Sequence, residues 1–218
     1  MQENPDLDVD YDSDLFHDQF SLVKRFVYHL FYYRTLHKDL QTHQVNSEFW
    51  THTTDGHLLQ ATMCWCMVFG SDRNPTHWKH LSPKNSKKIQ ASFRAGVVSH
   101  TGLTWEEWER YWTKMKNFRD TYAAHRETDP HDPVPNFDMA LQVAYYYDDW
   151  LRRVLWEGYS LEGKGRIYGS VFDEPPLRET WEMLEEQTTP LINSCIKQTK
   201  DFTGRRDLHK GRFLYECP

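Results

Sequence analysis

Hydrophobic residues recur along this chain at steps of three and four, and no stretch shows sustained alternation with a period of two. Steps of three and four gather apolar side chains on one face of a helix, whereas alternation is typical of a half-buried strand. The pattern therefore predicts an all-α protein. The expected helices cover residues 13–41, 47–69, 84–99, 104–125, 137–156 and 177–202.

Glycine and proline indicate where these helices weaken or end. Gly56 and Pro190 lie inside the second and the last helix and could divide them, and Gly70 is a natural stop for the second. The stretches 126–135 and 158–176 are rich in proline or glycine, so we expect loops there. Four to six helices joined by such loops favour an up-and-down or orthogonal helical bundle.

A chain of 218 residues is expected to form one domain. Residues 1–12 are acidic and poorly patterned, which predicts a flexible leader; residues 13–204 carry the helical pattern, and residues 205–218 form a basic tail. The leader lacks the apolar run of a signal peptide, and the longest apolar stretch, 61–69, is too short to span a membrane. Because neither a signal peptide nor a membrane-spanning segment is expected, we predict a cytoplasmic protein with no membrane partner.

Composition narrows the classes of site that the chain can hold. The nine Trp, twelve Tyr and twelve Phe residues can fill a sizeable core or interface. The net charge of −6 argues against nonspecific nucleic-acid binding over the whole surface, although a local basic site remains compatible with it. The four cysteines show no C-x-x-C spacing, and no Glu-x-x-His pair occurs in matched copies. His77 and His80 stand three residues apart and could share a ligand face on a short helix, but surface, cap or core positions are the favoured interpretation of the histidines. We expect free thiols, no metal and no cofactor.

The expected helix over residues 104–125 carries the most distinctive pattern. Thr104 and Glu107 form a capping box, in which the hydroxyl and the carboxylate each accept a hydrogen bond from a backbone amide at the helix start. Arg119 and His125 fall on the apolar side of this helix, where an unpaired charge is costly. The apolar face comprises Trp105, Trp108, Tyr111, Trp112, Met115, Phe118 and Tyr122.

Arg119 and His125 are the residue types that metal-independent RNA cleavage uses. An imidazole can take the proton from a ribose 2′-hydroxyl or protonate the leaving oxygen, and a guanidinium can bind the phosphate. Asp120 could orient a partner group across an interface, and Lys116 and Arg126 add local positive charge for RNA binding. In an α-helix, Arg119 and His125 would lie about 9 Å apart along the axis, and their side chains would differ in direction by about 120°. We therefore expect these two residues to act across a dimer. In the structural alternative, Arg119 pairs with a carboxylate of the bundle and His125 caps the helix end.

The segment RDTYAAH, residues 119–125, resembles the Arg–polar–x(3–5)–His signature of the HEPN superfamily, which occurs there near the end of a helix. Residues 65–81 are also similar to an abortive-infection subgroup, in which a W-x(3)-F-G and an H-W pattern precede the catalytic helix. The resemblance implies a compact helical bundle that dimerises so that two motifs face each other. It places Arg119 and His125 in the catalytic positions and Asp120 in the polar position.

Many members of that superfamily are metal-independent ribonucleases of toxin–antitoxin, abortive-infection and other defence systems, and others only bind nucleotides or partners. We therefore predict a HEPN-like bundle that acts as a metal-independent endoribonuclease in such a system. Its expected partners are RNA, a second copy of the chain, and an antitoxin or regulatory protein. The alternative is a non-catalytic helical module that binds a nucleotide or a protein, with Arg119 serving an ion pair.

Overall fold

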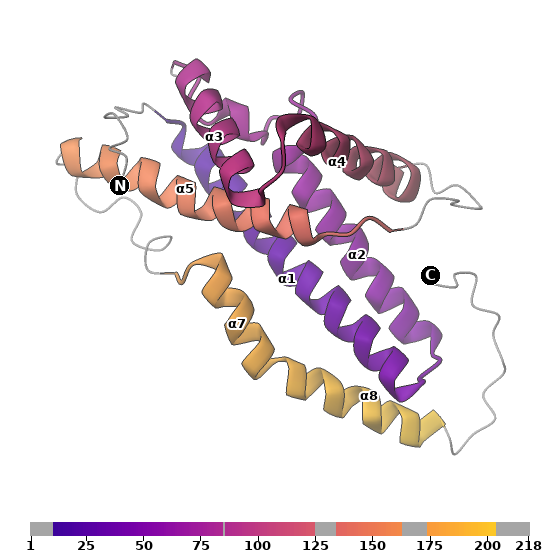
Figure 1. The fold of residues 1–218 in the computed structure, drawn as a ribbon. Helices are drawn as coiled ribbons and strands as arrows, with labels where there is room; N and C mark the ends of the chain where they lie inside the picture. Colours follow the sequence, from indigo (N-terminus) through magenta and orange to yellow (C-terminus); the bar gives the residue numbers. More distant parts are fainter. Residues whose placement is uncertain (1–10, 85, 125–133, 163–173, 204–218) are drawn as a thin grey trace.

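The computed structural model describes residues 11–84, 86–124, 134–162 and 174–203, and every regular element in this part of the chain is helical. The all-α bundle that the periodicity predicts is therefore confirmed (Figure 1). The elements are α1 (Ser13–His43), α2 (Glu48–Phe69), the 3₁₀ turn η1 (Trp78–His80), α3 (Ser86–Thr101), α4 (Trp105–Phe118), the π-helix η2 (Arg119–Ala124), α5 (Asp138–Glu162), α7 (Leu177–Gln187) and α8 (Thr189–Thr203).

The helices α1 and α2 run antiparallel side by side and form the central layer (Figure 1). The Asp12 carboxylate caps α1 by accepting hydrogen bonds from the amides of Asp14, at 3.1 Å, and Leu15, at 3.0 Å. Gly56 does not divide α2, which is continuous from Glu48 to Phe69. The cost of one glycine in a helix is only about 1 kcal/mol, which the packing of α2 against α1 outweighs.

On the other side of α1 lie α7 and α8, which follow its length (Figure 1). The expected break in the last helix is confirmed at Thr188, and Pro190 occupies the first turn of α8, where its missing N–H is tolerated. The carboxylate of Asp148 on α5 accepts a hydrogen bond from the amide of Leu177 at 2.8 Å and pairs with Arg152 at 2.9 Å. Because Leu177 is the first residue of α7, this carboxylate fixes the start of that helix against α5.

A series of buried hydrogen bonds connects α5, α1 and the loop before η1. Tyr147 donates its hydroxyl hydrogen to Gln19 on α1 at 2.7 Å, and the Gln19 amide donates to the backbone oxygen of His77 at 3.0 Å. Tyr145, Tyr146 and Tyr147 are all buried, so their rings pack in the core. The helix that carries them extends to Glu162, so the loop expected over 158–176 is wrong for its first five residues; residues 163–173 lie outside the described part.

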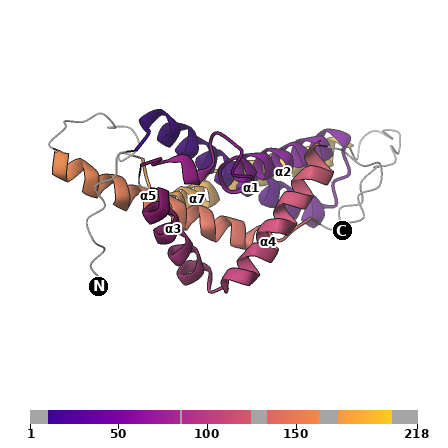
Figure 2. The same ribbon diagram turned by 90° about the horizontal axis from the view of Figure 1, so that it is seen from above.

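Seen from above, α3 and α4 form a V whose apex points away from α1 and α2 (Figure 2). One arm is fixed by α5, because the hydroxyl of Tyr146 fills the place where Gly96 on α3 would carry a Cβ and donates to the backbone oxygen of Ser92 at 3.3 Å. The other arm is fixed by α2 and η2. The space between the arms is therefore bordered by elements that are well anchored.

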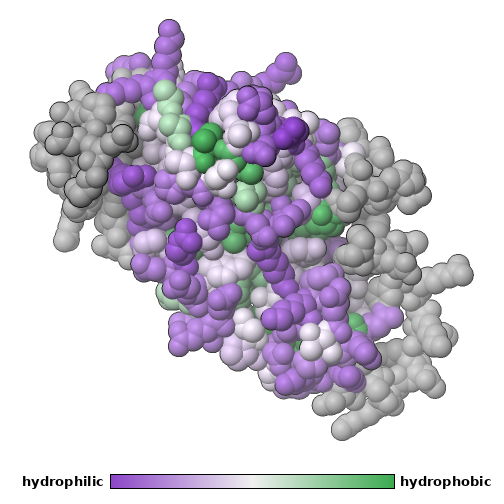
Figure 3. Space-filling model, viewed as in Figure 1, coloured by the Kyte–Doolittle hydropathy of each residue, from purple (hydrophilic) through white to green (hydrophobic). Residues whose placement is uncertain are grey.

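The face drawn in Figure 3 is mostly hydrophilic, and a small group of hydrophobic side chains lies in its upper half near α3. Among the described residues, no helix combines the length and the apolar character that a membrane crossing requires.

Two glycine substitutions should change stability in opposite directions. An alanine at Gly96 would collide with the Tyr146 side chain, so we expect Gly96→Ala to lower the free energy of unfolding by about 1–3 kcal/mol. An alanine at Gly56 would meet nothing within 4 Å, so Gly56→Ala should raise it by about 0.5–1 kcal/mol. Urea unfolding of both variants measures the difference, and equal effects would contradict the α3–α5 packing.

Candidate functional site

The tryptophan-rich helix begins as the sequence predicts. The Thr104 hydroxyl accepts a hydrogen bond from the Glu107 amide at 3.2 Å, and the Glu107 carboxylate accepts one from the Thr104 amide at 2.8 Å. This capping box is confirmed, and so is the apolar face. Three side chains of this face are buried, namely Trp108, Met115 and Phe118. The other four are partly buried against the core.

The end of this helix differs from the expectation. A single helix over residues 104–125 is wrong, because α4 ends at Phe118 and Arg119–Ala124 is a π-helix. Within this segment the Thr121 hydroxyl donates to the backbone oxygens of Asn117, at 3.0 Å, and Phe118, at 3.3 Å. The angular separation of 120° assumed α-helical geometry and does not apply across this segment. Short π-helical turns inside helices are frequent at functional sites.

Arg119 opens the π-helical segment and is held by its neighbour. Its Nη2 and Nε atoms lie 2.6 and 2.7 Å from Oδ1 of Asp120, and the two side chains are 19% and 49% exposed. The segment packs against α2, where the buried thiol of Cys66 lies within the electrostatic influence of both residues. Burial raises the pKa of the Cys66 thiol to about 12, so this thiol stays protonated and is not a nucleophile.

Of the remaining residues of the predicted site, Lys116 is described by the structure, whereas His125 and Arg126 are not. Lys116 lies one turn before Arg119, with its Nζ atom 4.0 Å from the centre of the Trp112 ring. His125 and Arg126 lie outside the described residues, so the structure places neither of them relative to Arg119.

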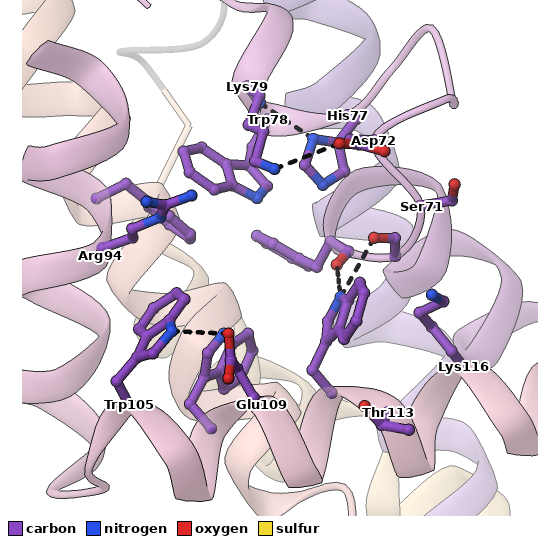
Figure 4. A pocket seen from close by; sticks show the side chains of 15 residues that line it. Ser71, Asp72, His77, Trp78, Lys79, Arg94, Trp105, Glu109, Thr113 and Lys116 are labelled. Atoms are coloured by element: carbon purple, nitrogen blue, oxygen red, sulfur yellow. Dashed lines mark hydrogen bonds and ion pairs between the residues drawn. The ribbon is translucent and has the colours of Figure 1, made fainter. Parts of the chain in front are cut away.

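Beside Lys116, a cleft of about 460 Å³ opens between the two arms of the V (Figure 4). We call it the tryptophan cleft, because four indoles line it: Trp78, Trp105, Trp108 and Trp112. Trp105 rises from α4 on one side, and Trp78 lies across from it on η1 (Figure 4). Its volume lies within the range of about 300–1,000 Å³ that is typical of ligand pockets.

Cations lie over the indoles around the cleft. The Arg94 guanidinium carbon is 5.4 Å from the Trp105 ring centre, and the Lys79 ammonium is 6.0 Å from that of Trp78. Together with Lys116, they give the cleft three cations, against the two carboxylates of Asp72 and Glu109. The cleft is therefore locally positive in a protein whose net charge is −6.

The two carboxylates are already engaged. Asp72 lies 3.5 Å from the ammonium of Lys79, and Glu109 accepts a hydrogen bond at 2.8 Å from the indole N–H of Trp105 (Figure 4). Among the described residues, neither Arg94 nor Lys116 has a carboxylate within ion-pair distance. These two cations can therefore interact with an anion in the cleft without breaking an existing ion pair.

The loop between α2 and η1 supports one wall of the cleft. The indole N–H of Trp112 donates to the backbone oxygens of Phe69, at 2.6 Å, and Gly70, at 3.2 Å, which are carbonyls at the end of α2. The Asn74 side chain donates to the backbone oxygen of Cys66 at 3.0 Å. A Cβ at Gly70 would collide with that same oxygen, so the turn requires glycine. The W-x(3)-F-G and H-W segments thus build the wall of the tryptophan cleft.

His77 lies in this wall and remains neutral. Burial, followed by the nearby Lys79 charge, lowers the pKa of His77 to about 3. Its Nδ1 atom accepts a hydrogen bond from the Lys79 amide at 3.3 Å, which leaves the ring proton on Nε2. An imidazole with so low a pKa is a poor general base at neutral pH, so His77 has a structural role.

Arg94 and the tryptophan cleft are the features that sequence reasoning missed. Arg94 occupies an exposed position of α3, and helical periodicity marks such a position only as a solvated face. Its partner Trp105 is 11 residues away on another helix. Only the angle between α3 and α4 brings the two side chains together, and a sequence pattern does not fix that angle.

His77 should make stability depend on pH. Its pKa is lowered on folding, so its contribution is complete above the unfolded value of about 6.5 and is lost as the pH falls towards 3, by up to about 1.4 kcal/mol per pH unit. Between pH 7.5 and 5.0, we expect the wild type to lose about 2 kcal/mol more unfolding free energy than His77→Asn. Urea unfolding at both pH values measures this, and equal losses would show that His77 titrates normally.

Searches of protein-family models, curated proteins and solved structures found no match to this chain. The residues of the chain and their geometry are therefore the basis on which its function is proposed.

Proposed function

We propose that this protein is a HEPN-like, metal-independent endoribonuclease. The observation that carries the proposal is the position of Arg119. It opens a π-helical segment at the end of α4, is partly exposed, and is fixed by Asp120 one turn beyond a cation-lined cleft. A guanidinium held in this way can bind a phosphate and stabilise the charge that develops on it during cleavage.

The proposed reaction needs no metal. His125 in its neutral form removes the proton from a ribose 2′-hydroxyl, and the resulting oxygen attacks the adjacent phosphorus. The bond from phosphorus to the 5′-oxygen breaks, and that oxygen leaves with a proton from the protonated form of a histidine. The products are a 2′,3′-cyclic phosphate and a 5′-hydroxyl. Arg119 stabilises the negative charge on the phosphoryl oxygens.

The ion pair between Arg119 and Asp120 supports a positioning role for the carboxylate. Asp120 is half exposed, and ion pairs of exposed groups contribute only about 0–1 kcal/mol to stability. The pair is therefore a weak stabiliser of the bundle, whereas it limits the rotamers of a long side chain at the mouth of the site. Binding of a phosphate requires the guanidinium to exchange part of this contact for the substrate.

The same ion pair is the observation that favours the alternative, a non-catalytic helical module that binds a nucleotide or a protein. In that case the Asp120 carboxylate neutralises Arg119 permanently, and His125 has no chemical role. The net charge of −6 fits this alternative as well. For the nuclease, we propose in addition a cytoplasmic role in a toxin–antitoxin or phage-defence system, with an antitoxin or regulatory protein as partner.

Cleavage should survive chelation and depend on both motif residues. In EDTA, we expect the purified protein to cleave single-stranded RNA and to leave 2′,3′-cyclic phosphate ends. Arg119→Ala and His125→Ala should each lower the rate about 100-fold or more, whereas Arg110→Ala, an exposed cation on the same helix, should not change it. Gel analysis of labelled RNA measures the rates. Equal activity of His125→Ala and wild type would reject the assignment.

The site is proposed to combine residues of two copies of the chain. In a mixture of Arg119→Ala and His125→Ala subunits, each mixed dimer contains one intact pair, with Arg119 from one subunit and His125 from the other. Half of the dimers are mixed, so the mixture should recover about a quarter of wild-type activity. Activity after mixing and re-association tests this, and a mixture as inactive as its components would rule out a shared site.

A further inference from the structure

We propose that the tryptophan cleft binds one nucleotide unit of a strand, with its base against the aromatic lining and its two flanking phosphates at Arg94 and Lys116. This proposal rests on the proposed ribonuclease function and gives the substrate a binding subsite next to Arg119. The motif in residues 119–125 does not contain this site, since the cleft is formed by α3, α4 and the loop before η1.

The lining provides flat surfaces for a base. Trp105 and Trp112 are only partly buried, and the Arg94 guanidinium lies over Trp105, so the cleft presents both indole and guanidinium groups. Bases stack on aromatic rings and on guanidinium planes, and stacking on an aromatic side chain contributes about 1–3 kcal/mol per base. Because every base has such a face, this surface would tolerate different sequences.

The charges favour a phosphate over a neutral aromatic ligand. Of the three cations, Lys79 is engaged by Asp72, while Arg94 and Lys116 contact indoles and, within the described residues, no carboxylate. Figure 4 shows Arg94 on one side of the cleft and Lys116 on the other. A bound nucleotide unit can therefore place its base between the two cations and its phosphates beside them.

The position of Lys116 connects the cleft to the proposed reaction. Lys116 lines the cleft, and Arg119 follows three residues later, about 4.5 Å further along the helix axis. A strand whose base occupies the tryptophan cleft therefore continues towards Arg119. The cleft would hold a nucleotide next to the bond that is cleaved, and would fix the register of the strand there.

Binding can be measured separately from cleavage. The full chain is titrated in EDTA with a fluorescent, single-stranded oligonucleotide whose 2′-oxygens are all methylated, because such a strand lacks the attacking hydroxyl and cannot be cut. Anisotropy gives Kd, and quenching of protein tryptophan fluorescence reports stacking. Free 5′-mononucleotides are added as competitors, since they carry the same base and phosphate. Displacement would identify a free nucleotide as a ligand, and a lack of displacement would identify the strand.

The variants are chosen in matched pairs. We expect Arg94→Gln with Lys116→Gln to weaken Kd at least 10-fold and to reduce the slope of log K against log salt by about 1.4, which corresponds to two phosphate contacts on a single strand. The control, Arg110→Gln with Lys114→Gln, removes the same charge from exposed positions of α4, neither of which lines the cleft, and should change Kd less than 2-fold. Trp105→Leu should weaken binding and reduce quenching while thermal unfolding still shows a folded bundle.

The outcomes separate this proposal from the ribonuclease function. Equal Kd and salt slope in wild type and Arg94→Gln/Lys116→Gln, or no binding of the methylated strand by the folded protein, would overturn the nucleotide site. Binding with the expected variant pattern, but without cleavage of unmodified RNA, would keep the site and reject the nuclease. Cleavage with unchanged rates in the cleft variants would keep the nuclease and reject the site.

Discussion

The hydrogen bonds from the Trp112 indole to the end of α2 join α4 to α2. The last carbonyls of a helix have no partner inside it, and here one N–H from α4 reaches two of them, on Phe69 and Gly70. This contact holds α4 against α2 while the rest of α4 diverges from α3. It therefore fixes both the wall of the tryptophan cleft and the direction in which the helix reaches Arg119.

The same wall depends on a second buried connection. Tyr147, Gln19 and His77 link α5, α1 and the loop before η1 through two hydrogen bonds between buried groups. Buried polar groups are costly unless they are paired, so this chain defines one position for the loop. The neutral state of His77 belongs to the same arrangement, because a charged imidazole would have to be buried beside Lys79. This wall is thus fixed by the core.

Local patterns in the sequence predicted the fold well, and longer-range geometry explains the remainder. The cap at Thr104, the stop at Gly70 and the break near Pro190 follow from local chemistry, and the structure has all three. The π-helix at Arg119 was missed, because the apolar face continues through Phe118 to Tyr122 and such a pattern does not distinguish a π-helix from an α-helix. The cleft was missed since Arg94 approaches Trp105 only through the angle between two helices. The pairing of Arg119 with His125 stays a prediction.

The distribution of charge would allow this acidic protein to bind the anionic ligand that we propose. The overall charge of −6 repels nucleic acid at a distance, and salt screens that repulsion beyond about 10 Å. Inside the cleft, Arg94 and Lys116 act at short range beside aromatic walls that exclude water, where electrostatic attraction is stronger than at an open surface. Binding by such a protein would depend on a strand entering one confined site. A confined site next to Arg119 would select flexible single strands over duplexes, because only an unpaired base can enter between the indoles.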